Sequence, residues 1–345
     1  MKNPDMPPTG SEQEGQDMEQ LEAEYAERLI EAALIHGFEF DEGQNAIIME
    51  VSPDDLLPEI RDYFFQGQDA QMPDEEFVSK VLRVYGVGEG AKEAGMQKQA
   101  KQILETQDNQ EELAQVPELY IDREVTIRDP KLKTQLKQSG IDMSQDKVAV
   151  MLMYRVKGVD LMNYLMQELV KNISEEEALS RPSVDAVRKQ LANSPNDVDV
   201  SQLFRAAAMT CGFEGNDGIV LNANDRDRLI KYLQKNDFIL DPSIISKIEN
   251  ALKILNNNGL YHNDLTERNV MVEFDDNGDV VEVYIIDFEK SSDEENPDFG
   301  GDMAIMTNYK ELTESSDQRT EEVIDTEILA AQKFTDHISK ARPEF

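Results

Sequence analysis

The sequence predicts an α+β protein of two lobes, in which a small antiparallel sheet with one helix precedes a mainly helical lobe. Three observations lead to this prediction. Before residue 157, segments typical of strands and of one helix follow in the order strand, strand, strand, helix, strand, strand. After Gly158, apolar residues recur mostly at the helical spacings of three and four. The length of 345 residues also suits two compact units.

The first lobe is expected over residues 21–155, after a disordered acidic tail at 1–20 that has no hydrophobic period. A helical pattern begins at Leu21 and stops at Gly37. Strand-like runs and one helical run then follow. They are two strands within 38–51, joined around Asp41–Gln44, a strand at Phe77–Val84, a helix at 91–105, and strands at 116–121 and Lys147–Val156.

The second lobe is expected over 156–310, with an insert at about 174–235 and an acidic helical tail at 311–345. Amphipathic patterns predict helices, which lie at 161–173, 225–235 and 242–258. The last of these ends in front of Gly259, which fits the position after a helix terminus.

The charge of the chain limits its partners. It carries 34 Lys and Arg against 71 Asp and Glu, which gives a formal charge of −37. Nucleic acids and anionic membranes bind basic surfaces, so we expect neither as a partner. A cationic small molecule or a basic protein is permitted.

The cysteine content and hydropathy point to the compartment. A single cysteine, Cys211, excludes an internal disulfide. No apolar run reaches the ~18 residues that span a bilayer. We therefore expect a cytoplasmic protein.

Polar groups suited to catalysis gather around one predicted hairpin. Two apolar runs flank Asn277–Gly278, which is a strong hairpin signal. In the hairpin that this turn predicts, Asn269 lies opposite Ile286, one residue from Asp287, and a register shift of one residue would place Asn269 and Asp287 face to face. Asp264 lies five residues before Asn269, in the loop that enters the same end. The three polar side chains are therefore expected to meet at the open end of the hairpin.

These residue types suit a metal and nucleotide site. Asn269 and Asp287 offer the hard oxygen ligands that Mg²⁺ prefers, and Asp264 is suited to orient a hydroxyl and accept its proton. The alternative interpretation is that the three residues cap turns or end a strand. That alternative is favoured for any one of them alone, whereas the three in register favour the site.

The same stretch resembles the catalytic loop and metal-binding turn of the protein-kinase-like superfamily. The pattern H-x-D-x-x-x-x-N is matched by His262–Asn269, and D-F-G by Asp287–Phe288–Glu289. By this resemblance Asp264 is the catalytic base, and Asn269 and Asp287 hold Mg²⁺ beneath ATP. The resemblance also implies a two-lobed protein-kinase-like fold, with ATP and Mg²⁺ as cofactors.

The resemblance further implies a strand lysine and a helix glutamate at the phosphates. Lys80 and Glu93 are the candidates, and Arg83 and Glu89 are the alternatives. A solvated surface pair is the other interpretation of these charges.

Two more segments resemble nucleotide-binding parts of the family. Gly43 and Gln44 lie in a turn expected to cover the phosphates, although one glycine stands where the family has three. Met153, Tyr154 and Val156 lie in a segment similar to the hinge between lobes, where backbone groups bind adenine. An ordinary core strand is the alternative for this segment.

Departures from the pattern point to the atypical branch of the superfamily. Asn263 replaces an arginine that usually binds a phosphorylated activation loop, and Glu289 replaces the glycine of D-F-G. In these positions the chain resembles choline/ethanolamine kinases and aminoglycoside phosphotransferases.

The expected function is ATP- and Mg²⁺-dependent phosphoryl transfer, first to a protein Ser or Thr hydroxyl and alternatively to a small cationic hydroxyl compound. A non-catalytic, kinase-like binding or structural module is the rival class. Transfer of AMP would use the same residues.

Overall fold

A computed structural model describes the fold of the chain. It describes residues 24, 27–31, 39–42, 46–51, 80–86, 89–143, 145–193, 198–213, 221–275, 277–295, 306 and 308–313. At 39–42, 46–51, 80–83, 89, 120 and 121 it describes the backbone alone. The predicted tail at 1–20, most of the tail at 311–345, and the turn with Gly43 and Gln44 lie outside the described residues.

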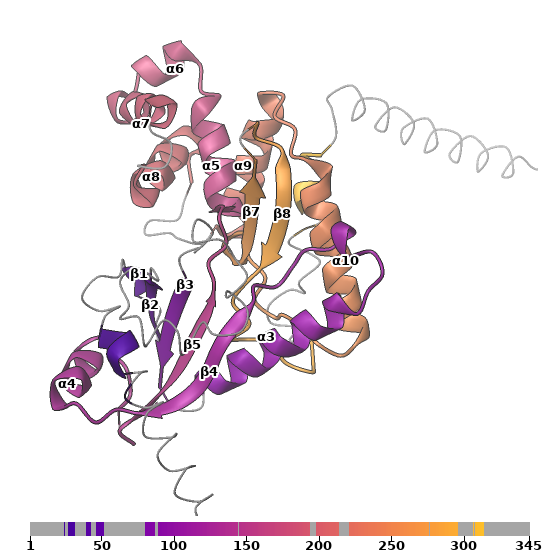
Figure 1. The fold of residues 1–345 in the computed structure, drawn as a ribbon. Coiled ribbons are helices and arrows are strands. Elements are labelled where there is room, and N and C mark those ends of the chain that lie inside the picture. The colour runs from indigo at the N-terminus through magenta and orange to yellow at the C-terminus, as the bar shows by residue number, and fades with distance from the viewer. Residues whose placement is uncertain are drawn as a thin grey trace, which may run out of the picture.

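The small lobe is built on a five-stranded antiparallel sheet (Figure 1). The strands lie in the order β1-β2-β3-β5-β4, so the chain enters at one edge and leaves from a central strand. Their bounds are β1 Glu39–Glu42, β2 Ala46–Val51, β3 Lys80–Tyr85, β4 Leu119–Thr126 and β5 Lys147–Tyr154. The predicted succession along the chain, which is three strands, a helix and two strands in one small sheet, is confirmed.

Helix α3 (Glu89–Glu105) packs against this sheet. Gly90 lies so close to the strands that a Cβ there would come within 2.7 Å of the Ala149 Cβ. The absence of a side chain at position 90 therefore lets the start of α3 sit tightly on β5.

The structure adds a second helix, α4 (Pro130–Gln138), between β4 and β5. Its N-terminus is capped by the Asp129 side chain, and Pro130 occupies the first turn, where a missing N–H costs nothing. Leu132 and Leu136 fill its buried side. The sequence analysis did not predict α4 because two apolar residues give little periodicity.

The large lobe is mainly helical and carries the largest apolar core among the described residues. Its helices are α5 Leu161–Lys171, α6 Glu175–Leu179, α7 Pro182–Asn193, α8 Val200–Cys211, α9 Ala223–Lys235 and α10 Pro242–Asn257. The predicted insert at about 174–235 thus forms α6 to α9. The apolar stripe of α10 is buried as predicted, and Gly259 follows the helix with φ 72°.

A second, three-stranded sheet lies within the large lobe (Figure 1). It contains β6 Val159–Asp160, β7 Val270–Phe274 and β8 Val280–Ile285. Val270 pairs with Ile285, so the predicted register is confirmed at the open end of the hairpin. Next to the turn the strand register shifts. The Asp275 N–H donates to the Asp279 carbonyl, so the turn is longer than the two-residue turn that Asn277–Gly278 predicts.

Backbone hydrogen bonds join the small lobe to the large lobe. The segment between α3 and β4 pairs with β8, since the Gln115 N–H donates to the Val283 carbonyl at 2.7 Å. The neighbouring Ala114 N–H donates to the Lys247 carbonyl of α10 at 3.0 Å. These contacts fix the end of α3 to the large lobe.

The two-lobed α+β architecture predicted from the sequence is confirmed. The core of the large lobe extends to Leu312, which is fully buried and accepts a hydrogen bond from the Leu240 N–H. Among the described residues, no helix has both the length and the apolarity needed to cross a membrane.

Candidate functional site

The structure brings Asp264, Asn269 and Asp287 together at the open end of the β7–β8 hairpin. Asn269 ends a short 3₁₀ turn, η6 (Glu267–Asn269), that leads directly into β7. Its side-chain amide donates to the Asp264 backbone carbonyl at 2.7 Å. Its own carbonyl accepts from the Ile286 N–H at 2.9 Å, next to Asp287. Because the amide nitrogen is bound, the Asn269 Oδ1 is the atom left to act as a metal ligand.

His262 holds the strand end that precedes Asp287. It is fully buried, and its Nε2 lies 2.9 Å from the Ile286 carbonyl. A carbonyl oxygen only accepts, so Nε2 carries the proton. The His262 ring also packs edge-on against Phe288, with the ring centroids 5.0 Å apart. His262 therefore contacts the residues on both sides of Asp287.

Two residues of the site adopt left-handed backbone conformations. Asn263 has φ 63° and Asp287 has φ 65°. Asn and Asp tolerate this region better than other residues with a Cβ, and such positions gather at functional sites. The left-handed conformation of Asp287 lies just after the end of β8, where the extended backbone stops.

Electrostatic repulsion marks the site. Burial raises the pKa of the Asp264 carboxyl, and the negative charge of Asp287 raises it further. His262 and Lys290 act in the opposite direction. The proximity of two carboxylates is unfavourable unless a cation lies between them.

The donor set fits Mg²⁺. The Asp287 carboxylate and the Asn269 amide oxygen are hard ligands, and Mg²⁺ keeps several waters and substrate phosphates in its shell. The described residues contain no group of three or more His, Cys, Asp or Glu side chains placed to hold a metal.

In the small lobe, Glu93 is fully buried on α3 and accepts a hydrogen bond from the Tyr85 hydroxyl of β3. Tyr85 pairs with Ala149 and belongs, with Met151 and Met153 of β5, to the apolar cluster that packs against α3. Glu93 thus lies beneath this face of the sheet.

The register of β3 distinguishes the two candidate cations. Arg83 pairs with Met151, whereas Lys80 pairs with Tyr154. Directly paired residues share a face of an antiparallel sheet, and successive residues alternate. Position 83 therefore lies on the face that packs against α3, and position 80 lies on the other face.

The hinge candidates lie at the end of β5 and in the segment that follows. Met153 is buried in the cluster against α3, and Val156 is buried as well. The Tyr154 N–H donates to the Glu118 carbonyl at 2.8 Å, and its ring lies 6.2 Å from that of Tyr284 in β8. Tyr154 therefore joins the small lobe to the large one.

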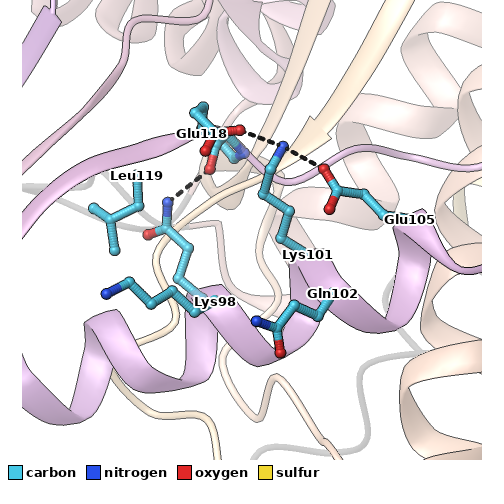
Figure 2. Close-up of a pocket in the computed structure, with 8 residues that line it drawn as sticks. Lys98, Lys101, Gln102, Glu105, Glu118 and Leu119 are labelled. Atoms are coloured by element: carbon cyan, nitrogen blue, oxygen red, sulfur yellow. Dashed lines mark hydrogen bonds and ion pairs between the residues drawn. The ribbon is translucent and has the colours of Figure 1, made fainter. Parts of the chain in front are cut away.

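A hollow of about 230 Å³ lies between α3 and the start of β4 (Figure 2). Lys101 crosses it and forms ion pairs with Glu118 at 2.9 Å and Glu105 at 3.1 Å. Lys98 pairs with Asp122 at 2.8 Å. Both lysines of the hollow are therefore paired with carboxylates of the chain.

Several residues that contact the site have no signal in the sequence. Arg226 of α9 and the Tyr309 hydroxyl both donate to the Glu267 carboxylate in η6. Asn263 donates to Ser292. No local pattern reveals these contacts, because the partners lie 29 to 42 residues apart.

Comparisons with known proteins give a distant structural similarity. A scan against protein-family models finds no match, and a search of curated proteins finds none. Among solved structures, one crystal structure described as a kinase domain is similar at 10% identity and a TM-score of 0.27. The similarity covers 74% of this chain and 50% of that one, so the chain spans half the length of the structure it matches.

Proposed function

We propose that this chain is an ATP- and Mg²⁺-dependent phosphotransferase whose acceptor is a hydroxyl group. The observation that carries the proposal is the convergence of Asp264, Asn269 and Asp287, with the Asn269 amide oriented by the Asp264 carbonyl. The buried Glu93 on the sheet-facing side of α3 supports it.

In this mechanism Asp264 orients the acceptor hydroxyl and takes its proton. Asn269 Oδ1 and the Asp287 carboxylate would hold Mg²⁺, which supplies charge neutralisation for the phosphates. One cation of β3 contacts the phosphates and is held by Glu93. The sequence motif suggests Lys80 for this role, whereas the strand register favours Arg83. Most of the rate enhancement then comes from positioning and charge stabilisation.

A protein Ser or Thr hydroxyl is the first candidate acceptor. A small cationic hydroxyl compound is the second, and one observation favours it. The segment after Asp287 returns at once to the catalytic loop, because Tyr261 and Ser292 exchange two backbone hydrogen bonds of 2.9 and 3.0 Å. Only residues 288–291 lie between Asp287 and this return, which is a short segment for holding an extended peptide. The formal charge of −37 attracts cations.

The test is transfer of label from γ-³²P-ATP in the presence of Mg²⁺. Ser/Thr peptides, choline-like amino alcohols and aminoglycosides are offered as acceptors. Asp287→Asn and Asp264→Asn are expected to abolish transfer. Asp279→Asn, at the opposite end of the same hairpin, is the matched control and is expected to transfer normally.

Each other outcome identifies a rival. Label that arrives only from α-³²P-ATP indicates AMP transfer. Thermal stabilisation by ATP without any turnover indicates a non-catalytic binding module. Transfer that persists in Asp287→Asn would refute the proposed site.

A further inference from the structure

A buried ionic cluster lies at the base of the catalytic loop. The Glu267 carboxylate is fully buried, and Arg226 is 9% exposed. Arg226 Nε donates to Glu267 Oε1, and the Tyr309 hydroxyl donates to the same oxygen at 2.5 Å. Within the described part of the chain, the second oxygen of Glu267 has no hydrogen-bond partner.

The cluster joins three distant segments. Arg226 lies in the first turns of α9, in the insert, and Tyr309 lies near the end of the described chain. Glu267 stands between Asp264 and Asn269, two residues before the latter. The carboxylate therefore fixes the loop at the point where it turns from the proposed base to the proposed metal ligand.

Stability alone is a poor reason for such a cluster. Removing two charges from water costs about as much as their attraction returns, and apolar replacements are often neutral or stabilising. Buried ionic groups are better suited to fixing one geometry, because their hydrogen bonds are directional. Here both donors converge on one carboxylate oxygen, which restricts how the loop can shift.

We propose that Arg226 and Tyr309 are positioning residues that act through Glu267 to fix the loop bearing Asp264 and Asn269. This inference rests on the proposed function, since it assigns these residues a role in phosphoryl transfer. It makes α9 and the segment around Tyr309 contributors to turnover, although neither supplies a reacting group.

The test replaces the cluster with apolar side chains of similar volume. The triple variant Arg226→Met, Glu267→Leu, Tyr309→Phe is compared with Arg228→Met. Arg228 lies on the same helix but donates to Gly212 instead of the loop. Three quantities are measured: the urea midpoint of unfolding, kcat and KM for ATP, and amide hydrogen exchange at residues 264–269.

We expect the triple variant to fold with a similar midpoint and to lose about 10- to 100-fold in kcat, with KM for ATP changed less than about threefold. Exchange at 264–269 should accelerate about tenfold or more, while Arg228→Met matches the unmodified protein. A folded triple variant with unchanged kcat and unchanged loop exchange would overturn the proposal.

The triple variant can be replaced by a single substitution. If the triple variant does not fold, Tyr309→Phe alone removes one hydrogen bond, and the same loss in kcat and gain in loop exchange are expected of it on a smaller scale. Unchanged values in Tyr309→Phe would then overturn the proposal. If the unmodified protein transfers no phosphate, the proposed function fails, while hydrogen exchange still decides whether the cluster fixes the loop.

Discussion

The Asn263 side-chain amide donates to Ser292 Oγ at 2.7 Å and to the Glu294 carbonyl at 3.0 Å. These bonds tie the loop at 262–269 to the segment that follows Asp287. Ser291 Oγ adds a hydrogen bond to the His262 carbonyl at 3.2 Å. The loop and the segment are thus joined through neutral groups of the chain itself.

Replacing Asn263 by Ala should destabilise the protein by about 2–4 kcal/mol. Two hydrogen bonds of a buried side chain contribute about 0.5–1.5 kcal/mol each, and a left-handed backbone adds about 1 kcal/mol for Ala. Asn263→Gly separates the two causes, because Gly adopts φ 63° without strain. Urea unfolding measures both variants. If the Ala variant is as stable as the unmodified protein, these hydrogen bonds do not hold the segment.

Gly158 should not tolerate a side chain. It lies in the segment between β5 and β6, and a Cβ there would lie 2.2 Å from the Val272 backbone carbonyl oxygen. Because backbone cannot move aside cheaply, Gly158→Ala should cost about 3 kcal/mol or more. The matched control is Gly95→Ala in the exposed middle of α3, where nothing lies within 4 Å and a gain of about 1 kcal/mol is expected. Equal effects of the two substitutions on the unfolding midpoint would contradict the close approach at Gly158.

Magnesium and nucleotide should stabilise the protein through Asp287. The negative charge of Asp287 is one cause of the raised pKa of Asp264, so the two carboxylates repel each other at neutral pH. Asp287→Asn removes this repulsion and should raise the unfolding free energy in the absence of Mg²⁺ by up to about 1 kcal/mol.

Adding Mg²⁺·ATP should make the unmodified protein more stable than Asp287→Asn. At 100 times its dissociation constant a ligand stabilises the folded state by about 2.7 kcal/mol, and Asp287→Asn should lose most of this shift. Asp279→Asn should keep it. A melting temperature that rises equally in all three proteins would place the nucleotide away from Asp287.

The cation proposed to pair with Glu93 can be identified by paired substitutions in β3. The register places position 83 on the face against α3 and position 80 on the other. Arg83→Ala should therefore weaken ATP binding about tenfold, the equivalent of about 1.4 kcal/mol, while Lys80→Ala changes it less than about twofold. Equilibrium dialysis with labelled ATP gives both numbers. The reverse result would restore Lys80, the choice that the sequence motif suggests.

The parts predictable from sequence are those set by local patterns. The apolar stripe of α10 and the register that places Asn269 opposite Ile286 follow from periodicity and from one turn signal. The turn itself differs because Asp275 accepts the backbone N–H groups of Asn277 and Asp279, which reshapes it. The local pattern could not assign a face to Lys80, because that depends on pairing with β5. The Arg226–Glu267 contact spans 41 residues and has no local signal at all.

Asp160 provides a test of buried charge near the site. Its side chain caps α5 by accepting from the Asn163 N–H at 2.8 Å, and burial raises the pKa of its carboxyl, while Arg268 acts in the opposite direction. A raised pKa means that the folded state binds the proton more readily than the unfolded state, so the Asp160 charge costs stability at neutral pH. This cost disappears as the pH falls through the raised pKa.

Asp160→Asn keeps an oxygen for the cap and removes the charge, and the Asn163 amide, which donates to the second Asp160 oxygen at 2.5 Å, can turn over to accept from the new amide. It should therefore equal or exceed the stability of the unmodified protein at pH 7.5, and this advantage should shrink as the pH is lowered towards 4. Asp160→Ala loses the cap and should cost about 1 kcal/mol relative to Asn at every pH. Urea unfolding across this range measures the differences. An advantage of Asn that stays constant with pH would show that the Asp160 carboxyl is not perturbed by burial, and equal stabilities of Ala and Asn would show that the cap contributes nothing.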